Sequence, residues 1–364
     1  MNDRQRLIAC LTGQPVDRTP YLLFWNPWWT TWERWKREGL PREFRDMRDV
    51  RAHFGADLSW GYVPVDFGPC PFPDRQVLQE NDETVLWIDS WGVKRRDFKT
   101  HQSMSEFLDF PVKSRADWER YRDQWLDPDD PRRLAGPWRE LCAQWQAEDR
   151  PIQMGTFPDT GLYGTLRWLL GDEGCLLAFM DEPRLVHEIM DHMTDVYLAV
   201  YQQVVPEVRV DIIHMWEDMC GRQGPLISPR HWEEFLGPGY RRIRAFCDAH
   251  GIPLLSVDTD GQPERIIPPM MAFGVNFLFP MEVAAGCDVN DTVRRHPELG
   301  MLGGIDKRAL AVGPEAIDRE FARVRPAVES GRYVPDLDHL IPDDVSWANF
   351  CHYARGLKAL TGKA

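Results

Sequence analysis

The amino-acid sequence predicts an α/β protein folded as a closed (β/α)8 barrel, a TIM barrel, with its functional site at the carboxyl ends of the strands. Short apolar runs that end in an acidic residue or a histidine recur along the chain, and the clearest is residues 252–258, which Asp260 and Gly261 follow. Such a run is typical of a buried parallel strand that delivers side chains to a pocket. Eight strands, each followed by helical sequence, are expected near residues 19, 57, 151, 210, 252, 275, 300 and 332.

The alternative architecture is an open, doubly wound parallel sheet. Neither GxGxxG nor GxxxxGKS/T follows any expected strand, so the nucleotide signature that would support such a sheet is missing. The 364 residues suit one large domain, and no linker marks a boundary. We therefore expect a single barrel domain over residues 1–364. It carries an N-terminal extension and an antiparallel meander inserted near residues 77–107, where polar and apolar residues alternate.

The N-terminal extension begins with a predicted short helix that Asn2 or Asp3 caps and that ends near Leu11. After the first strand, five tryptophans follow at helical spacing, at positions 25, 28, 29, 32 and 35. This spacing predicts a helix with its indoles on one face, which is either buried or turned toward a second copy of the chain in a homodimer. The alternative is an aromatic wall or lid over a flat ligand, with Trp25 and Trp28 in contact with it.

The remaining elements follow in chain order. Residues 109–146 are polar with helical spacing of charges, and a long helix is expected over residues 176–205 with a break near Pro183. From residue 210 onward, strands and helices alternate regularly. The helices are expected at residues 229–250, 263–272, 288–296, 314–330 and 346–360.

Composition excludes several classes of function. The net charge of -14, with no basic cluster to offset it, makes a nucleic-acid partner unexpected. No run of about 18 apolar residues occurs, and no apolar segment follows the first residues, so we expect a soluble cytoplasmic protein without membrane contact. The eight cysteines are scattered without CxxC pairs, which indicates reduced thiols, mostly in the core.

Acidic residues gather at the expected strand ends. The candidate catalytic residues, which are also the candidate ligands of a divalent metal, are Glu217, Asp258, Asp260, Asp306 and His339. Together with Asp218 and Glu282 they would place six carboxylates around one mouth. A cation, a basic partner or shared protons must then offset the charge. For Asp258 and Asp260 the alternative is capping of the following helix and salt bridges at the barrel rim.

Basic residues and glycines also lie near these strand ends. Arg222, Arg265, Lys307 and Arg308 are the nearest residues in the sequence that could neutralise the acids. Gly303 and Gly304 allow either close approach to a ligand or a kink in the barrel. His339 is placed for general acid or base catalysis, or else is a solvated loop residue. His214 lies inside a predicted strand, where a hydrogen-bonded core histidine is expected. The candidate cofactor-binding set is Trp25, Trp28, Arg222, Gly303, Gly304 and Lys307.

Four short motifs lie along the chain: Pro15-Val-Asp-Arg-Thr-Pro20, Phe107-Leu-Asp-Phe-Pro-Val-Lys113, Gly224-Pro-Leu-Ile-Ser-Pro229 and Gly303-Gly-Ile-Asp-Lys307. Together they resemble the uroporphyrinogen decarboxylase superfamily, which also holds the cobalamin-dependent methyltransferases. The likeness runs over nearly the whole chain. It implies a (β/α)8 barrel with the site at its carboxyl-terminal mouth.

Two departures from the family pattern bear on chemistry. True uroporphyrinogen decarboxylases carry an arginine-rich segment after the first motif, whereas this chain has no Arg between Arg18 and Arg34. An octacarboxylate would lose its charged partners there, so we do not expect uroporphyrinogen to be decarboxylated. The coenzyme M methyltransferases resemble this chain but carry His-x-Cys-Gly where Asp258-Thr-Asp-Gly261 stands, and a further Cys where Asp306 stands. Any metal is therefore expected to be a harder ion with oxygen and nitrogen ligands.

The resemblance implies a methyltransferase that moves a methyl group between a small molecule and the corrinoid, a cobalamin, of a partner protein. One alternative is a decarboxylase or lyase acting on a small carboxylated or tetrapyrrole-like substrate. A second alternative is a noncatalytic protein that binds a corrinoid or a tetrapyrrole.

Overall fold

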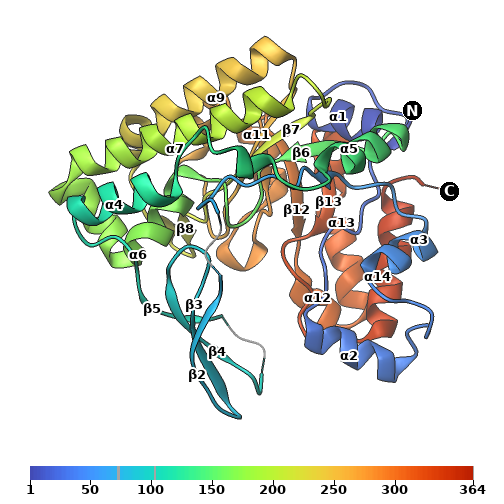
Figure 1. Ribbon diagram of the computed structural model, residues 1–364. Coiled ribbons are helices and arrows are strands. Elements are labelled where there is room, and N and C mark those ends of the chain that lie inside the picture. Colours follow the sequence, from blue (N-terminus) through green and yellow to red (C-terminus); the bar gives the residue numbers. More distant parts are fainter. Residues whose placement is uncertain (72–73, 102–103, 364) are drawn as a thin grey trace.

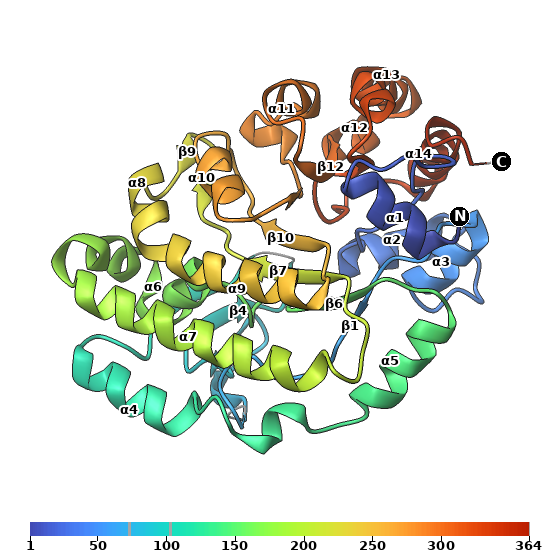
Figure 2. The ribbon, with the colours of Figure 1, turned by 90° about the horizontal axis from the view of Figure 1, so that it is seen from above.

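The computed structural model describes residues 1–71, 74–101 and 104–363. Its centre is a curled sheet of seven strands in the order β1-β6-β7-β10-β11-β12-β13, and every neighbouring pair is parallel (Figures 1 and 2). The strands are β1 (Gly61–Tyr62), β6 (Ile152–Met154), β7 (Ile212–Trp216), β10 (Leu254–Asp258), β11 (Phe277–Phe279), β12 (Gly300–Ile305) and β13 (Tyr333–Leu337).

Helices surround this sheet, as the view from above in Figure 2 shows. Because they cover its outer face, both faces of the strands are buried, and this explains the continuous apolar runs of the sequence. The helices are α1 (Asp3–Leu11), α2 (Trp29–Glu38), α3 (Met47–Phe54), α4 (Arg115–Trp125), α5 (Trp138–Ala147), α6 (Leu162–Asp181), α7 (Pro183–Val204), α8 (Pro229–His231), α9 (Gly237–His250), α10 (Ile267–Ala272), α11 (Val289–Arg295), α12 (Lys307–Val312), α13 (Pro314–Ser330) and α14 (Trp347–Leu360). Short helical turns lie at η1 (Pro131–Leu134), η2 (Trp232–Leu236) and η3 (Val283–Ala285).

The curled parallel sheet confirms the predicted α/β class, but a closed ladder of eight strands is not confirmed. The expected first strand, near residue 19, is extended and forms no ladder with β13 or β1. The side chains of Asp57 and Asp336 accept the N–H groups of Tyr21 and Phe24, at 2.9 and 2.8 Å. In a strand these N–H groups would donate to neighbouring strands, and Pro20 has no N–H group to donate.

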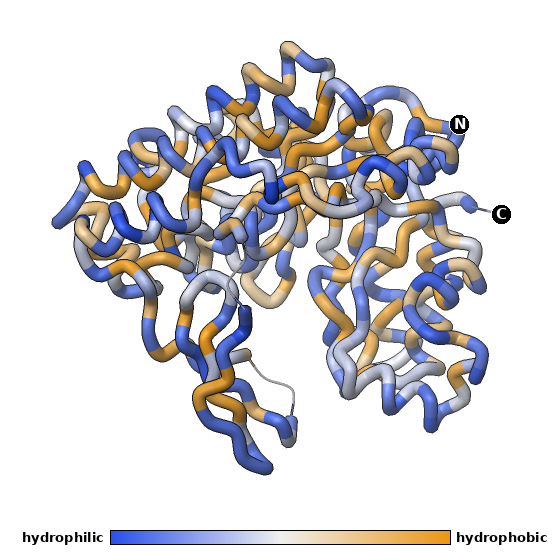
Figure 3. The backbone as a smooth tube through the Cα atoms, in the orientation of Figure 1, coloured by the Kyte–Doolittle hydropathy of each residue, from blue (hydrophilic) through white to orange (hydrophobic). Residues whose placement is uncertain are grey.

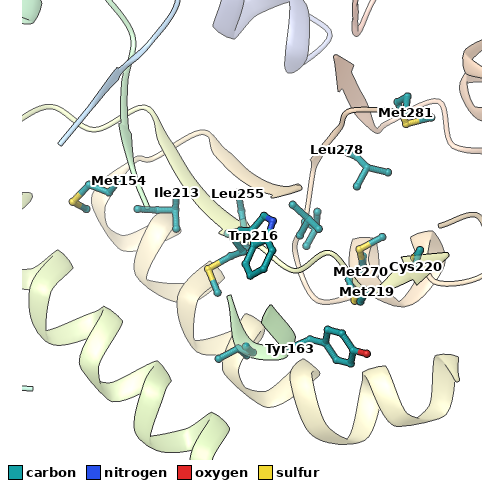
Figure 4. Packing of buried hydrophobic residues seen from close by; sticks show 14 of the residues in the cluster. Met154, Tyr163, Ile213, Trp216, Met219, Cys220, Leu255, Met270, Leu278 and Met281 are labelled. Atoms are coloured by element: carbon teal, nitrogen blue, oxygen red, sulfur yellow. The ribbon is translucent and has the colours of Figure 1, made fainter. Parts of the chain in front are cut away.

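Side chains nevertheless fill the interior on that side. Leu22 and Trp60 pack in one cluster with Leu254 and Leu302 of the strands. Leu7 of α1 belongs to the same cluster and covers the amino-terminal end of the sheet. A larger cluster fills the space between the strands and the helices, and Figure 4 shows part of it close by. The sheet therefore has a packed interior without a complete ring of hydrogen bonds.

A separate four-stranded antiparallel sheet occupies the segment for which the sequence predicts a meander. Its strands, in the order β2-β3-β4-β5, are β2 (Gln76–Glu80), β3 (Thr84–Ile88), β4 (Lys94–Phe98) and β5 (Glu106–Asp109). It projects from the parallel sheet (Figure 1), and the tube in Figure 3 shows apolar segments along it. A short hairpin of β8 (Cys220–Gly221) and β9 (Gly224–Pro225) follows β7.

The tryptophan-rich segment differs from its prediction. Helix α2 begins only at Trp29, so Trp25 and Trp28 lie outside it and the five indoles do not share a helical face. The reason is local: Pro27 lies in a bridge with Ile341, whose carbonyl accepts the Trp28 N–H at 3.0 Å. Within the helix, Trp35 is fully buried and packs against Phe350 of α14.

Several element boundaries also differ. Helix α6 begins at Leu162, 14 residues before the expected start at 176, and α12 is an additional helix after β12. The expected helix over residues 229–250 is divided into α8, η2 and α9. All eight cysteines are free thiols and seven are buried, as expected. Within the described residues, no helix has the length and apolar character needed to cross a membrane.

Candidate active site

A cavity of about 470 Å³ opens at the carboxyl ends of β7, β10 and β13, between the parallel sheet and the antiparallel one. This is where the strand ends of such a fold present their side chains. The apolar part of its wall is aromatic and comes from Trp25, Phe107, Phe110, Phe157, Trp168 and Trp216. The charged part comes from Arg95, Arg167, Asp172, Asp218, Asp258, Asp260 and the neighbouring His339.

The aromatic wall has a defined geometry. Trp168 of α6 and Trp216, the last residue of β7, stack with ring centroids 5.7 Å apart and planes inclined by 21°. Phe157 meets the Trp216 ring edge-on at 4.8 Å, and Phe107 of β5 meets Trp168 at 5.3 Å. Flat indole faces of this kind give a planar ligand a large contact area.

Two aspartates lie beside this wall. Asp258 ends β10 directly opposite Trp216 in the strand register, and Asp260 follows two residues later. Burial, together with the carboxylates of Asp260 and Asp218, raises the pKa of Asp258 well above its usual range. Burial and the carboxylates of Asp218 and Glu282 raise the pKa of Asp260 to about 7. The pair therefore holds at least one proton near neutral pH.

His339 follows β13 and completes the acidic wall. Its ring stacks on Trp25 with centroids 5.0 Å apart, and its Nε2 lies 3.5 Å from Oδ2 of Asp260. Burial, and secondarily the Lys307 ammonium, lower the pKa of His339 to about 4. The imidazole is therefore neutral near pH 7, and the proton of this pair resides mainly on Asp260.

Arg167 of α6 was not predicted from the sequence, although it neutralises one of the acids. Its guanidinium donates to the side chain and to the carbonyl of Asp218, both at 2.7 Å, and to Asp172 at 2.7 Å. Asp218 has a positive φ of 40°, an unfavourable backbone state that these two bonds hold in place. Within the described chain, Asp258 has no cationic partner and Asp260 has only the neutral His339.

Glu217 lies outside the cavity, contrary to the prediction that groups it with the catalytic and metal-binding acids. It is fully buried, and its carboxylate accepts the N–H groups of Leu162, Tyr163 and Gly164 at the start of α6, at 2.7 to 3.1 Å. The Tyr240 hydroxyl donates a fourth bond at 2.5 Å. Burial raises the pKa of Glu217, and these four donors act in the opposite direction. Glu217 therefore anchors α6 to β7.

Asp306 is also absent from the cavity wall. It caps α12 by accepting the Arg308 N–H at 2.9 Å, and the Arg308 guanidinium binds both of its carboxylate oxygens. Although burial acts to raise it, Arg308 lowers the pKa of Asp306 below its usual value. Asp306 is therefore a helix cap with a salt bridge to Arg308, a role that the sequence analysis considered for Asp258 and Asp260 and not for this residue.

Gly303 and Gly304 serve close packing within the fold. A Cβ at Gly303 would lie 1.9 Å from the Pro280 carbonyl oxygen, and one at Gly304 would lie 2.3 Å from a methyl group of Val289. Both residues have positive φ angles of 107° and 72°. The structure therefore supports the interpretation of a kink in β12 rather than contact with a cofactor.

The remaining predicted cofactor residues are dispersed. Arg222 is exposed between β8 and β9, and Trp28 caps the amino end of α2. Lys307 lies near the acids, since its charge lowers the pKa of Asp260 and His339, but it does not line the cavity. Only Trp25 of that set does. His214 is the expected core histidine: it is buried, lies 2.9 Å from the Ser256 hydroxyl, and burial lowers its pKa to about 3.

The four acids and the histidine predicted as metal ligands do not form a metal site within the described residues. Across residues 1–71, 74–101 and 104–363, no group of three or more His, Cys, Asp or Glu side chains is arranged to hold an ion. Glu217 and Asp306 use their oxygens within the fold, as described above, and the residues present therefore do not fit the predicted metal.

Substitution of Asp306 tests this assignment. Asp306→Ala is expected to lower the free energy of unfolding by about 1 kcal/mol, because α12 loses its cap and Arg308 its partner. Activity and metal content should not change. Urea denaturation and elemental analysis measure both quantities, and loss of a bound metal in the variant would instead restore the predicted ligand set.

The fold and cavity together define the class: an α/β protein with a curled parallel sheet and an acidic, aromatic site at the strand ends. Within that class, the chain belongs to the uroporphyrinogen decarboxylase (URO-D) family, whose sequence model matches residues 171–356. This confirms the resemblance noted from the motifs.

One protein is similar to this chain in sequence and another in structure. A uroporphyrinogen decarboxylase from Rhodococcus erythropolis (strain PR4 / NBRC 100887) is 27% identical over 173 residues, which are 44% of this chain and 45% of the relative. The match thus spans less than half the length of that relative. A methyltransferase from Methanosarcina mazei has a similar structure, with a TM-score of 0.60 and 15% identity, covering 100% of this chain and 99% of that one. The second likeness shows that the two proteins share a fold.

Proposed function

We propose that the protein is a methyltransferase that moves a methyl group between a small, flat molecule and the corrinoid of a partner protein. The observation that carries the proposal is the pair of carboxyl groups, Asp258 and Asp260, that lies in the cavity wall beside the aromatic rings. Burial and neighbouring carboxylates raise the pKa of both groups. The structural likeness to a methyltransferase supports the same proposal.

The chemistry requires an acid at this position. When a methyl group leaves an oxygen or nitrogen atom, the bonding electron pair stays on that atom, which must take up a proton or remain a poor leaving group. Asp260 holds such a proton near neutral pH, because its pKa is raised to about 7. The stacked Trp168 and Trp216 would orient a flat substrate against the acid.

A corrinoid presented at the mouth would supply the nucleophile that accepts the methyl group. The residues there fit a large apolar group: Met104 and Phe157 line the cavity while 81% and 57% exposed. Exposed apolar side chains at the rim of a cavity are typical of a surface that a partner covers.

Decarboxylation is the second candidate, favoured by the decarboxylase name of the Rhodococcus relative. In that reaction Asp260 would protonate the carbanion left by the departing CO2. The cavity opposes a substrate with many carboxylates, however, because its four aspartates outnumber its two arginines. Arg167 is already paired with Asp172 and Asp218.

The test is a methyl-transfer assay with a reduced corrinoid protein. Purified protein is mixed with methoxylated aromatics, methylated amines or methanol, and the visible spectrum of the corrinoid is followed together with the demethylated product. Transfer that depends on Asp260 supports the proposal. Release of CO2 from carboxylated substrates without any methyl transfer would support the decarboxylase instead, and coproporphyrin formed from uroporphyrinogen would do so directly.

A further inference from the structure

A second cavity of about 330 Å³ adjoins the first on the side of the antiparallel sheet. Arg95, Phe157 and Trp168 line both cavities. The rest of the second wall comes from Arg75 and Trp87 of the antiparallel sheet and from the turn that follows β3. Because three residues are common to both walls, one elongated molecule can contact the two cavities at once.

Two arginines lie close to one aromatic ring in the second cavity. The guanidinium groups of Arg75 and Arg95 lie over the Trp87 ring, 4.2 and 4.9 Å from its centroid. Arg95 is paired with Asp89 at 3.3 Å and Asp97 at 3.7 Å, whereas Arg75 has no ion pair within the described residues. The guanidinium of Arg75 is therefore available to a ligand in this cavity.

A buried donor in the shared wall lacks a partner. Trp168 is 8% exposed, and its indole Nε1 makes no hydrogen bond to the part of the chain that the structure describes. A buried N–H without an acceptor costs about 1 to 3 kcal/mol. This nitrogen is itself out of contact with solvent, so a ligand in either cavity would not reach it, and the second site is defined by its arginines and rings.

We infer that Arg75, Arg95 and Trp87 form a subsite for a carboxylate at one end of the substrate. The inference rests on the proposed function, since the other end of the substrate is the methylated atom that faces Asp260. The substrate class that fits both cavities is a flat aromatic acid that carries a methylated oxygen or nitrogen. The guanidinium groups bind its carboxylate, and the Trp168 and Trp216 rings hold its plane.

The test compares two probes of the same shape, 4-methoxybenzoate and its uncharged amide, 4-methoxybenzamide. Calorimetric titration of the full chain needs no corrinoid partner and no turnover. The acid is expected to bind about tenfold more tightly than the amide. Arg75→Gln should lower the affinity for the acid about tenfold and leave that for the amide unchanged, and Arg75→Lys should retain part of the difference.

A matched control is Arg230→Gln on α8, where the native side chain is 88% exposed and distant in sequence from both cavities. It should bind both probes as the wild type does. Three results would overturn the inference. The wild type could bind the two probes with equal affinity, it could bind neither probe, or Arg75→Gln could lose binding of both. Probe discrimination without methyl transfer would overturn only the proposed function, so the two failures are distinguishable.

Discussion

Replacement of Asp260 by Asn is expected to lower kcat for methyl transfer by about 10²- to 10⁴-fold, the range that a positioned general acid contributes. Asn has nearly the same shape and keeps an oxygen acceptor, so substrate binding and folding should change little. The leaving atom would then have no acid in contact with it other than Asp258, which is opposite Trp216 in the strand register. Single-turnover spectroscopy of the corrinoid gives the rate, and thermal unfolding checks the fold.

The pH dependence of the same reaction has a definite sign. A general acid acts in its protonated form, and the pKa of Asp260 is raised to about 7. The rate should therefore be constant at lower pH and fall as the pH rises through about 7, by tenfold per unit beyond it. His339 does not produce this fall, because its pKa is lowered to about 4 and it is already neutral there.

Asp123→Asn on α4 is the matched control, since the native side chain is 67% exposed on the surface. It should retain the wild-type rate and pH profile. A fully active Asp260→Asn protein, or one whose pH profile is that of the wild type, would contradict the assignment of Asp260 as the acid.

The residues that the sequence identified correctly as cavity residues share one property: each follows a buried apolar run. Asp258, Asp260 and His339 stand at or just beyond the ends of β10 and β13, where parallel strands present side chains to a common edge. The apolar runs and the α/β fold class are together sufficient to predict that these three side chains lie at the strand ends. The same apolar runs predict the parallel sheet.

The residues that sequence reasoning missed reach the cavity by tertiary folding alone. Arg167 and Trp168 lie on the first turns of α6, whose start was not recognised, and Arg95 and Phe107 belong to an inserted sheet that folds over the strand ends. The alternation of polar and apolar residues in an inserted sheet predicts its strands, but it does not predict which part of the protein the sheet packs against. The one available signal was Phe157, an aromatic residue shortly after the end of β6.

Glu217 and Asp218 show why adjacent acids cannot be assigned by pattern. Asp218 lines the cavity and Glu217 faces the start of α6, because Asp218 has a positive φ and neighbouring side chains point apart. The prediction of a closed eight-stranded sheet was not confirmed for a comparable reason. The N–H groups of Tyr21 and Phe24 bind aspartate side chains from distant parts of the chain, which no local pattern reveals.

Removal of the Glu217 carboxylate should produce the largest loss of stability. Glu217→Ala leaves three N–H groups of α6 and the Tyr240 hydroxyl in a fully buried place without an acceptor. Each buried polar group left without a partner costs about 1 to 3 kcal/mol. Because relaxation of the helix start recovers part of this, we expect the free energy of unfolding to fall by about 3 to 5 kcal/mol.

Tyr240→Phe provides the matched comparison, because it removes only one of the four hydrogen bonds and leaves the carboxylate and the packing in place. Its free energy of unfolding should fall by about 1 kcal/mol. Urea denaturation of the two variants and the wild type gives both values. If Glu217→Ala unfolds like the wild type while methyl transfer is abolished, Glu217 acts in the chemistry, as the sequence had suggested, and the structural role assigned to it is wrong. A stability loss several times that of Tyr240→Phe means that the acid instead joins the start of α6 to the end of β7, and so holds Arg167 and Trp168 at the cavity wall.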